Sequence, residues 1–178
     1  MLAFAPLTAA VAIVAPPALD SPVYSLVTRG PDGRANMNIV TYFTAVAHAP
    51  ERWYAASLYH GTESRENFLA GNGGVVQILS DAQADVGLLE LLGKQSARDV
   101  DKLAEIERRG LGLRRVRDDW PVLSDCVGCF ELAATSVHTC GDHDVALCRM
   151  LWYEDIVRDA PPLRTARLRE LGILPPAT

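Results

Sequence analysis

The chain has 178 residues, of which 49% are hydrophobic and 22% charged, and its formal net charge at pH 7 is -5. These proportions are typical of a globular domain and exclude an intrinsically disordered or fibrous protein. The acidic balance argues against a nucleic-acid-binding protein, because such a protein presents a basic face to phosphates.

Residues 1–21 predict an N-terminal arm or leading strand. The stretch is apolar, but no lysine or arginine precedes Arg29, whereas a secretion signal begins with positive charge. Pro6, Pro16 and Pro17 interrupt any helix long enough to span a membrane. We therefore expect a cytoplasmic protein without a membrane segment.

β-Branched and aromatic residues predict four strands in the first half of the chain. Residues 22–28 predict the first strand, and a Pro-Asp-Gly turn at residues 31–33 leads into a second strand over residues 37–47. Residues 53–59 and 75–79 predict the third and fourth strands. The fold is thus expected to open with a hairpin.

Short helices are predicted between the strands. Thr62 is a suitable N-cap for the first helix, and Gly71 is a suitable stop. The second helix begins after a cap at Asp81 or Asp85 and stops at Gly93. Val100, Leu103 and Ile106 predict a third helix that begins near Ser96 or Asp99, and a last helix is expected over residues 164–171.

Two further strands are predicted over residues 127–138 and 145–153, joined by a turn at residues 140–143. Six strands without regular alternation with helices predict a mainly-β fold, an antiparallel six-stranded barrel with short helical insertions. We expect this domain over residues 22–158, followed by a C-terminal tail over residues 159–178.

Residues 35–44 mix amide, hydroxyl and aromatic side chains. Amides and backbone groups can bond the polar edge of a flat heteroaromatic ring while apolar side chains cover its face. The same composition also fits an ordinary strand that follows a turn. The segment therefore indicates a candidate ring-binding strand and leaves both interpretations open.

The segment from Tyr59 to Asn67 predicts a strand end that leads into a helix N-terminus. Unpaired N–H groups and the helix dipole attract phosphate there, and Thr62 and Ser64 add hydroxyl groups. Thr62 can equally serve as a plain helix cap. The two functions are compatible, because a cap and a phosphate use neighbouring donors.

Four cysteines, Cys126, Cys129, Cys140 and Cys148, are expected to be free thiols. The gap between the first two is typical of zinc and redox sites, but seven residues separate the last two, and structural zinc sites usually pair ligands at closer spacing. A zinc site or a disulfide is therefore the less favoured alternative, and we expect no metal.

An arginine-rich stretch over residues 108–117 predicts a solvated loop. The alternative is an anion-binding patch for the phosphates of a dinucleotide.

The order of these segments resembles the flavin-reductase-like family of FMN-binding split barrels. The resemblance covers residues 22–153, and the tail sequence LRELGIL is similar to one branch of the family. The segments that carry it are PVYSLVT, DGRANMNIVTYFTAV, RWYAASLYHGTESRENF, LLGKQSARDVDKL, PVLSDCVGCFEL and GDHDVALC.

The resemblance implies a set of flavin-binding residues. Those implied to contact the isoalloxazine ring and ribityl chain are Asn36, Met37, Asn38, Thr41 and Tyr42, with Tyr59 beside them. Thr62 and Ser64 are implied to meet the phosphate, and Ser96, Arg98 and Lys102 to lie near the same pocket.

His143 is the candidate catalytic residue that the resemblance implies, close to the flavin or to the incoming nicotinamide. Its role there would be to manage a proton or to position the substrate. From local sequence alone, His143 could instead simply bond the carboxylates beside it.

The resemblance implies an FMN-binding oxidoreductase that takes hydride from NADH or NADPH, with FAD as an alternative flavin. A homodimer and a monooxygenase partner for the reduced flavin are implied as well. Two other functions stay open: a flavin-binding electron carrier without nicotinamide chemistry, and a biosynthetic enzyme with an altered pocket on the same fold.

Overall fold

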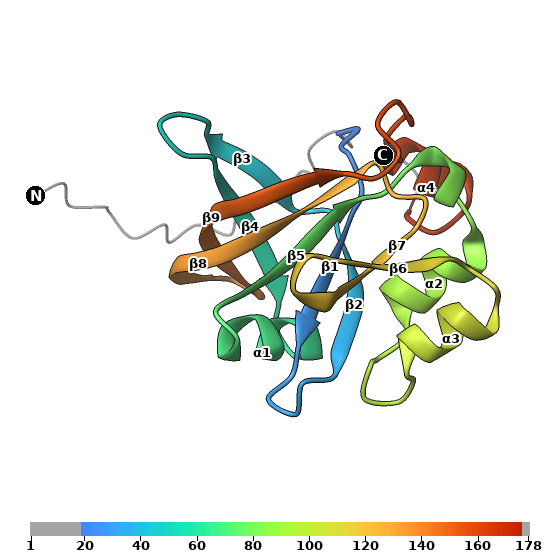
Figure 1. Ribbon diagram of the computed structural model, residues 1–178, viewed down its shortest axis with the longest axis horizontal. Coiled ribbons are helices and arrows are strands. Elements are labelled where there is room, and N and C mark those ends of the chain that lie inside the picture. Colours follow the sequence, from blue (N-terminus) through green and yellow to red (C-terminus); the bar gives the residue numbers. More distant parts are fainter. Residues whose placement is uncertain (1–18, 176–178) are drawn as a thin grey trace, which may run out of the picture.

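The computed structural model describes residues 19–175, so most of the expected N-terminal arm lies outside the described residues. The described chain is an antiparallel β-structure with short helices, which confirms the mainly-β fold class (Figure 1). Its strands are β1 (Tyr24–Arg29), β2 (Ala35–Val40), β3 (Phe43–Ala47), β4 (Trp53–Tyr59), β5 (Gly73–Ile78), β6 (Leu113–Val116), β7 (Trp120–Leu123), β8 (Gly128–Cys140) and β9 (His143–Asp155). Its α-helices are α1 (Glu63–Ala70), α2 (Val86–Lys94), α3 (Lys102–Arg108) and α4 (Thr165–Glu170).

Seven strands form one sheet in the order β2-β1-β5-β8-β9-β4-β3, and β6 pairs with β7 in a separate ribbon. Every pairing is antiparallel. β2 and β3 lie at opposite edges of the sheet although only two residues, Thr41 and Tyr42, separate them in the chain. The sheet must therefore curl until its edges meet at this point, where the Ser57 N–H donates to the Tyr42 carbonyl oxygen at 3.0 Å.

The structure corrects three details of the prediction. The strand expected over residues 37–47 is two strands, because the chain crosses from one sheet edge to the other at Thr41 and Tyr42. The β6–β7 ribbon replaces part of the expected arginine loop, and the described chain has nine strands rather than six. Gly93 does not stop α2, which continues one residue further; it leaves room for Ile39, whose Cδ1 would lie 3.4 Å from an added Cβ.

Two predicted helix starts are confirmed by side-chain caps. Thr62 accepts the Arg65 N–H at 3.3 Å at the start of α1, and Asp85 accepts the Leu88 N–H at 2.7 Å at the start of α2. Such caps satisfy N–H groups that have no acceptor inside the helix. α3 begins after Asp101, later than predicted. α4 falls within the range expected for the tail helix.

The two faces of the sheet pack into separate cores. One core gathers Phe68 of α1 and Phe130 of β8 with apolar side chains of β1, β4, β5 and β9. On the other face, α2, α3, α4 and the β6–β7 ribbon cover the sheet. Because side chains alternate along a strand, Met37 points into this second core and the flanking Asn36 and Asn38 point the other way. No helix within residues 19–175 is long and apolar enough to cross a membrane.

Candidate functional site

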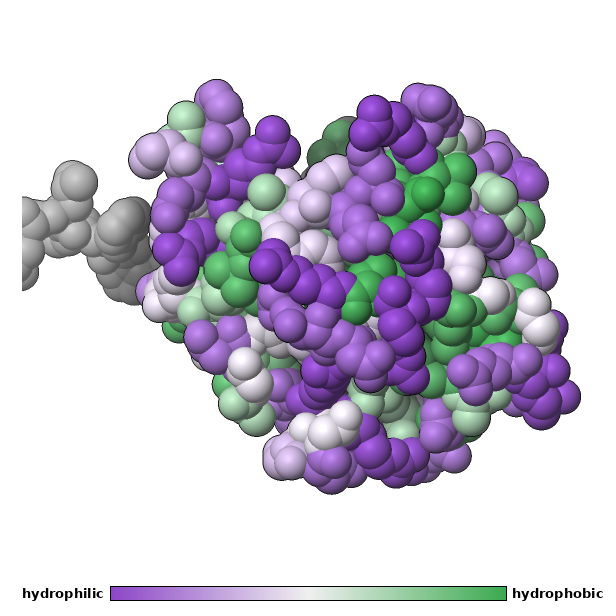
Figure 2. Space-filling model, viewed as in Figure 1, coloured by the Kyte–Doolittle hydropathy of each residue, from purple (hydrophilic) through white to green (hydrophobic). Residues whose placement is uncertain are grey.

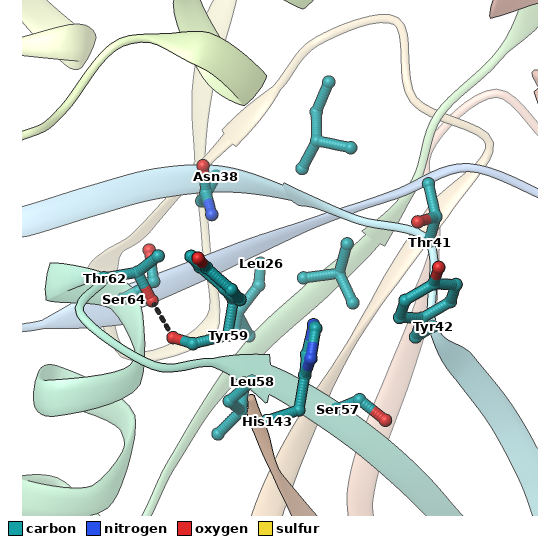
Figure 3. Close-up of a pocket in the computed structure, with 12 residues that line it drawn as sticks. Leu26, Asn38, Thr41, Tyr42, Ser57, Leu58, Tyr59, Thr62, Ser64 and His143 are labelled. Atoms are coloured by element: carbon teal, nitrogen blue, oxygen red, sulfur yellow. Dashed lines mark hydrogen bonds between the residues drawn. The ribbon is translucent and has the colours of Figure 1, made fainter. Parts of the chain in front are cut away.

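Two adjoining hollows form one groove where β2 and β4 approach each other, and Figure 3 shows the residues that line the first of them. Their volumes are about 180 and 250 Å³, and they share Asn38, Tyr59, Thr62 and Ser64. Small-molecule sites usually measure roughly 300–1,000 Å³. Neither hollow reaches that range alone, but the joined groove does.

One end of the groove is aromatic. The His143 ring lies between Tyr42 and Tyr59, with ring centroids 5.5 and 5.3 Å away, and points into the hollow (Figure 3). Tyr42 is 67% exposed and Tyr59 54%, so both rings keep free faces. Nδ1 of His143 donates to the Asp142 carboxylate at 2.7 Å, because a carboxylate can only accept. Nε2 is therefore the ring nitrogen left for a ligand.

The other end of the groove is the N-terminus of α1. The N–H groups of Glu63 and Ser64 have no acceptor inside the helix and carry the positive end of its dipole. The Ser64 hydroxyl accepts from the Asn36 amide at 3.0 Å and keeps its own proton to donate. The Thr62 hydroxyl is already used, since it caps the helix and donates to the Tyr59 carbonyl oxygen at 2.8 Å.

Lys102 supplies a buried positive charge to this end. Its side chain is 4% exposed, and Nζ donates to the Leu92 carbonyl oxygen at 3.0 Å and to Asn38 Oδ1 at 3.3 Å. An ammonium group has three protons, so one is left for a ligand. Burial lowers the pKa of Lys102 to about 8, and the nearby Glu63 carboxylate opposes that shift.

Asn36 carries an unpaired acceptor at the groove. Its Oδ1 is buried, and no group of the described chain donates to it, while Nδ2 is held by Ser64. Buried polar atoms are rarely left unpaired in proteins. A ligand that donates a hydrogen bond here would satisfy this oxygen. Taken with the aromatic end and the positively charged end, the groove suits an elongated molecule with a flat ring at one end and an anion at the other.

Most of the predicted site residues come together in this groove. Those that line it are Asn36, Asn38, Thr41, Tyr42, Tyr59, Thr62, Ser64, Ser96, Lys102 and His143.

Met37 and Arg98 do not line the groove. The Met37 side chain is fully buried in the core beneath α2 and α3, on the opposite face of β2 from Asn38, so its expected ring contact is not supported by the structure. Arg98 instead donates to the Gly61 carbonyl oxygen at 2.9 Å and to Glu66 at 2.7 Å. It ties the α2–α3 loop to the start of α1 and faces an adjoining polar hollow.

Sequence reasoning missed several lining residues. Ser57 could have been found, because it shares a strand face with Tyr59 at period two. Leu26 lines the groove only because β1 places it opposite Asn38, a register that no local pattern indicates. The other missed residues are Ile39, Val40, Leu58, Gly61, Glu63, Gly93, Lys94, Gln95 and Ala97.

The cysteines and the arginine-rich stretch do not contribute to the groove. All four thiols are free, and burial raises the pKa of Cys126, Cys129 and Cys148 to about 12, which disfavours the thiolate form that binds metals. Within the described residues, no cluster of histidine, cysteine and carboxylate side chains could hold a metal ion.

Several arginines of the arginine-rich stretch form ion pairs with carboxylates of the same chain. Arg108 and Arg109 both contact Glu105, and Arg114 contacts Glu154. Figure 2 shows polar residues predominating on the face that carries the β6–β7 ribbon, with the apolar ones in small separate patches. These contacts favour a solvated surface over an anion-binding patch.

Comparisons with known proteins agree with this geometry. A family model described as "Flavin reductase like domain" matches residues 17–167. No curated protein sequence has a significant match to the chain.

Among the solved structures that share the fold are two flavin proteins and a proposed oxidoreductase. An FMN-binding protein from Thermus thermophilus aligns with a TM-score of 0.64 at 19% identity, over 87% of this chain and 80% of that one. The styrene monooxygenase flavin reductase from Pseudomonas putida aligns with a TM-score of 0.65 at 18% identity, over 82% and 85%. A proposed oxidoreductase from Sinorhizobium meliloti has a TM-score of 0.68 at 18% identity, and the match covers 82% of this chain but only 46% of that one. The match therefore covers less than half the length of the third protein.

Proposed function

The chain belongs to the flavin reductase-like domain family, and from this premise we propose that it binds FMN in the groove and reduces it with NADH or NADPH. When bound, the flavin supplies the redox chemistry by accepting hydride from the nicotinamide. One observation supports the proposal above all. A single groove has His143 between two tyrosines at one end and Lys102 beside a helix N-terminus at the other. FAD is the alternative flavin.

The α1 end of the groove fits the FMN phosphate. The Lys102 ammonium would neutralise phosphate charge, and the Ser64 hydroxyl and the first-turn N–H groups of α1 would donate to its oxygens. Ser96 lines the same hollow. Thr62 contributes mainly by capping the helix, because its hydroxyl already has both a donor and an acceptor.

The aromatic end fits the isoalloxazine ring. Tyr42 and Tyr59 offer exposed ring faces for stacking. Aromatic rings prefer to stack in an offset arrangement. The unpaired Oδ1 of Asn36 would accept a hydrogen bond from the ligand along the groove. Nε2 of His143 would then hold a proton at the ring end or position the nicotinamide.

A monooxygenase is the partner class that we propose for the reduced flavin. The name of the Pseudomonas putida neighbour links a flavin reductase to a monooxygenase, and we extend that link to this chain. A cytoplasmic location belongs to the same proposal.

Visible spectra of the purified protein test the proposal. We expect flavin absorbance maxima, either as purified or after FMN is added and unbound FMN is removed. We also expect these maxima to bleach when NADH or NADPH is added without oxygen. Bleaching only by dithionite would replace the reductase with an electron carrier. Absence of bindable flavin would favour an enzyme with an altered pocket on this fold.

A homodimer is part of the proposal, and the edge strand β3 supports it. After Phe43 every residue of β3 is exposed, and Val46 is 52% exposed. Open apolar strand edges are natural pairing surfaces. We expect light scattering after gel filtration to give twice the chain mass of 19.3 kDa. Val46→Asp should shift the protein towards monomer, whereas Val86→Asp on α2 should not; a monomeric parent protein would contradict the proposal.

A further inference from the structure

Asp144 is a buried carboxylate that lies outside the groove but beside both of its ends. It is 2% exposed and accepts three side-chain hydrogen bonds, from Nε2 of His60 at 3.1 Å, Nε of Arg65 at 2.6 Å and the Thr139 hydroxyl at 2.8 Å. A buried carboxylate is costly unless it is paired and hydrogen-bonded. These bonds hold the pKa of Asp144 at about 2, so it is ionised throughout the physiological range.

The donors to Asp144 come from segments that carry the groove. His60 follows Tyr59 at the end of β4, and its N–H donates to the Asp142 carbonyl oxygen at 2.9 Å. Arg65 follows Ser64 in the first turn of α1, and Asp144 itself follows His143 at the start of β9. The carboxylate therefore joins the histidine end of the groove to the helix end.

Arg65 ties the first turn of α1 to Asp144 and so restrains the direction of the helix. Its side chain is 28% exposed, and its guanidinium reaches from α1 to the Asp144 carboxylate on β9 with a charge-assisted bond. α1 has only eight residues, so one fixed arginine in its first turn restrains the direction in which its N–H groups point. Other contacts also hold this region: the Thr62 cap, the His60 contact, Arg98 through Gly61 and Glu66, and the Asn36–Ser64 bond. Arg65 is the α1 side chain that ties the helix to β9.

We propose that Asp144, acting through Arg65, is a positioning residue that aims the N-terminus of α1 at the ligand's phosphate. The inference rests on the proposed flavin function, because it assigns the phosphate to this end of the groove. Neither residue lines the groove, so neither touches the ligand. We expect the loss of the Arg65 bond to act mainly on the phosphate end, because Arg65 belongs to α1, while the side chains that line the ring end are kept.

Riboflavin and FMN separate this role from a general contribution to folding. The two ligands share the ring and the ribityl chain and differ only in the phosphate. Loss of folded protein or of the ring pocket would weaken both by the same factor. Loss of the α1 direction would weaken FMN selectively, so the ratio of the two dissociation constants measures the proposed role.

The test is fluorescence titration of riboflavin and FMN against the full chain. Asp144→Asn should weaken FMN about fivefold to tenfold and riboflavin less than twofold. Arg65→Gln, at a partly exposed and thus more tolerant site, should reproduce the selective loss, and the double variant should be no worse than Asp144→Asn because the residues act as one unit. Glu131→Gln removes a charge bonded to the Trp152 ring N–H at 2.6 Å on the same sheet and should change neither constant.

Three outcomes would overturn the inference. Asp144→Asn and Arg65→Gln could weaken both flavins equally, which would indicate a structural role alone. They could leave the FMN constant unchanged, which would remove any role at the phosphate. Finally, the parent protein could bind neither flavin, and only this outcome would also remove the proposed function.

Discussion

His143→Ala should lower the rate at which NADH or NADPH reduces bound FMN by about a hundredfold, while FMN binding changes less than threefold. The variant removes the ring between Tyr42 and Tyr59 together with the only imidazole that lines the groove. Positioned proton-transfer groups contribute roughly 10²–10⁴-fold to catalysis. We expect the lower limit here, because the main step is hydride transfer and proton transfer to the flavin only accompanies it. The phosphate end is untouched, so affinity is retained. Anaerobic stopped-flow reduction and FMN titration measure the two quantities separately.

Two further variants sharpen the His143 prediction. His48→Ala removes an exposed histidine between β3 and β4 and should leave the reduction rate unchanged. His143→Asn keeps a hydrogen-bonding side chain but cannot carry the proton. Rescue by asparagine would indicate that His143 positions the nicotinamide, and a full loss would indicate that it holds a proton. A rate for His143→Ala within threefold of the parent would remove His143 from the catalytic site.

Local chemistry in the sequence was enough to predict two helix starts and most strands. Thr62 and Asp85 cap their helices as expected, because a cap depends on residues within three positions in the chain. β4 matches its predicted range, because its aromatic residues fit a pleated surface. Short-range rules succeed where the stabilising contacts are short-range.

The break between β2 and β3 could not be predicted in the same way. Residues 39–44 form an unbroken run of β-branched and aromatic residues, and nothing local marks Thr41 and Tyr42 as the crossing between two sheet edges. That crossing depends on closure of the whole sheet, with β8 and β9 between the edges. The groove forms at this closure, so its position depends on contacts that are distant in the chain.

Met37 and Asp144 show what sequence patterns leave out of the site. The family resemblance assigns Met37 to the flavin ring, but strand alternation turns its side chain into the core on the other face of the sheet. Only the observed pairing of β2 shows which of its residues face the groove and which face that core. In the sequence, Asp144 is an acidic residue beside the turn at residues 140–143, and nothing in the pattern distinguishes it from Asp142. Its importance comes from three donors that lie 5, 79 and 84 residues away in the chain.

Lys102→Met should weaken FMN binding about 10- to 100-fold and riboflavin binding less than threefold. A hydrogen bond to a charged group is worth about 1.5–3 kcal/mol, and that range corresponds to this loss. Methionine has a similar length and fits the buried channel beside Leu92 without its charge. The only other lysine of the chain, Lys94, is half-exposed and paired with Glu90, so Lys94→Met should weaken FMN at most about threefold. Equal losses for the two lysine variants would contradict the assignment.

FMN affinity should also fall as the pH rises through about 8, because the buried Lys102 ammonium of the free protein loses its proton near that pH. The sign follows from linkage: phosphate binds the ammonium form more tightly, so binding raises the pKa of Lys102 and takes up a proton above pH 8. A phosphate monoester is already close to a dianion there, since its second pKa is about 6, and the ligand does not cause the change. Riboflavin affinity should show no such fall, and Lys102→Met should abolish it for FMN. If the variant kept the pH dependence of the parent, the titrating group would be another residue, and the phosphate would have to be held chiefly by the α1 N–H groups and Ser64.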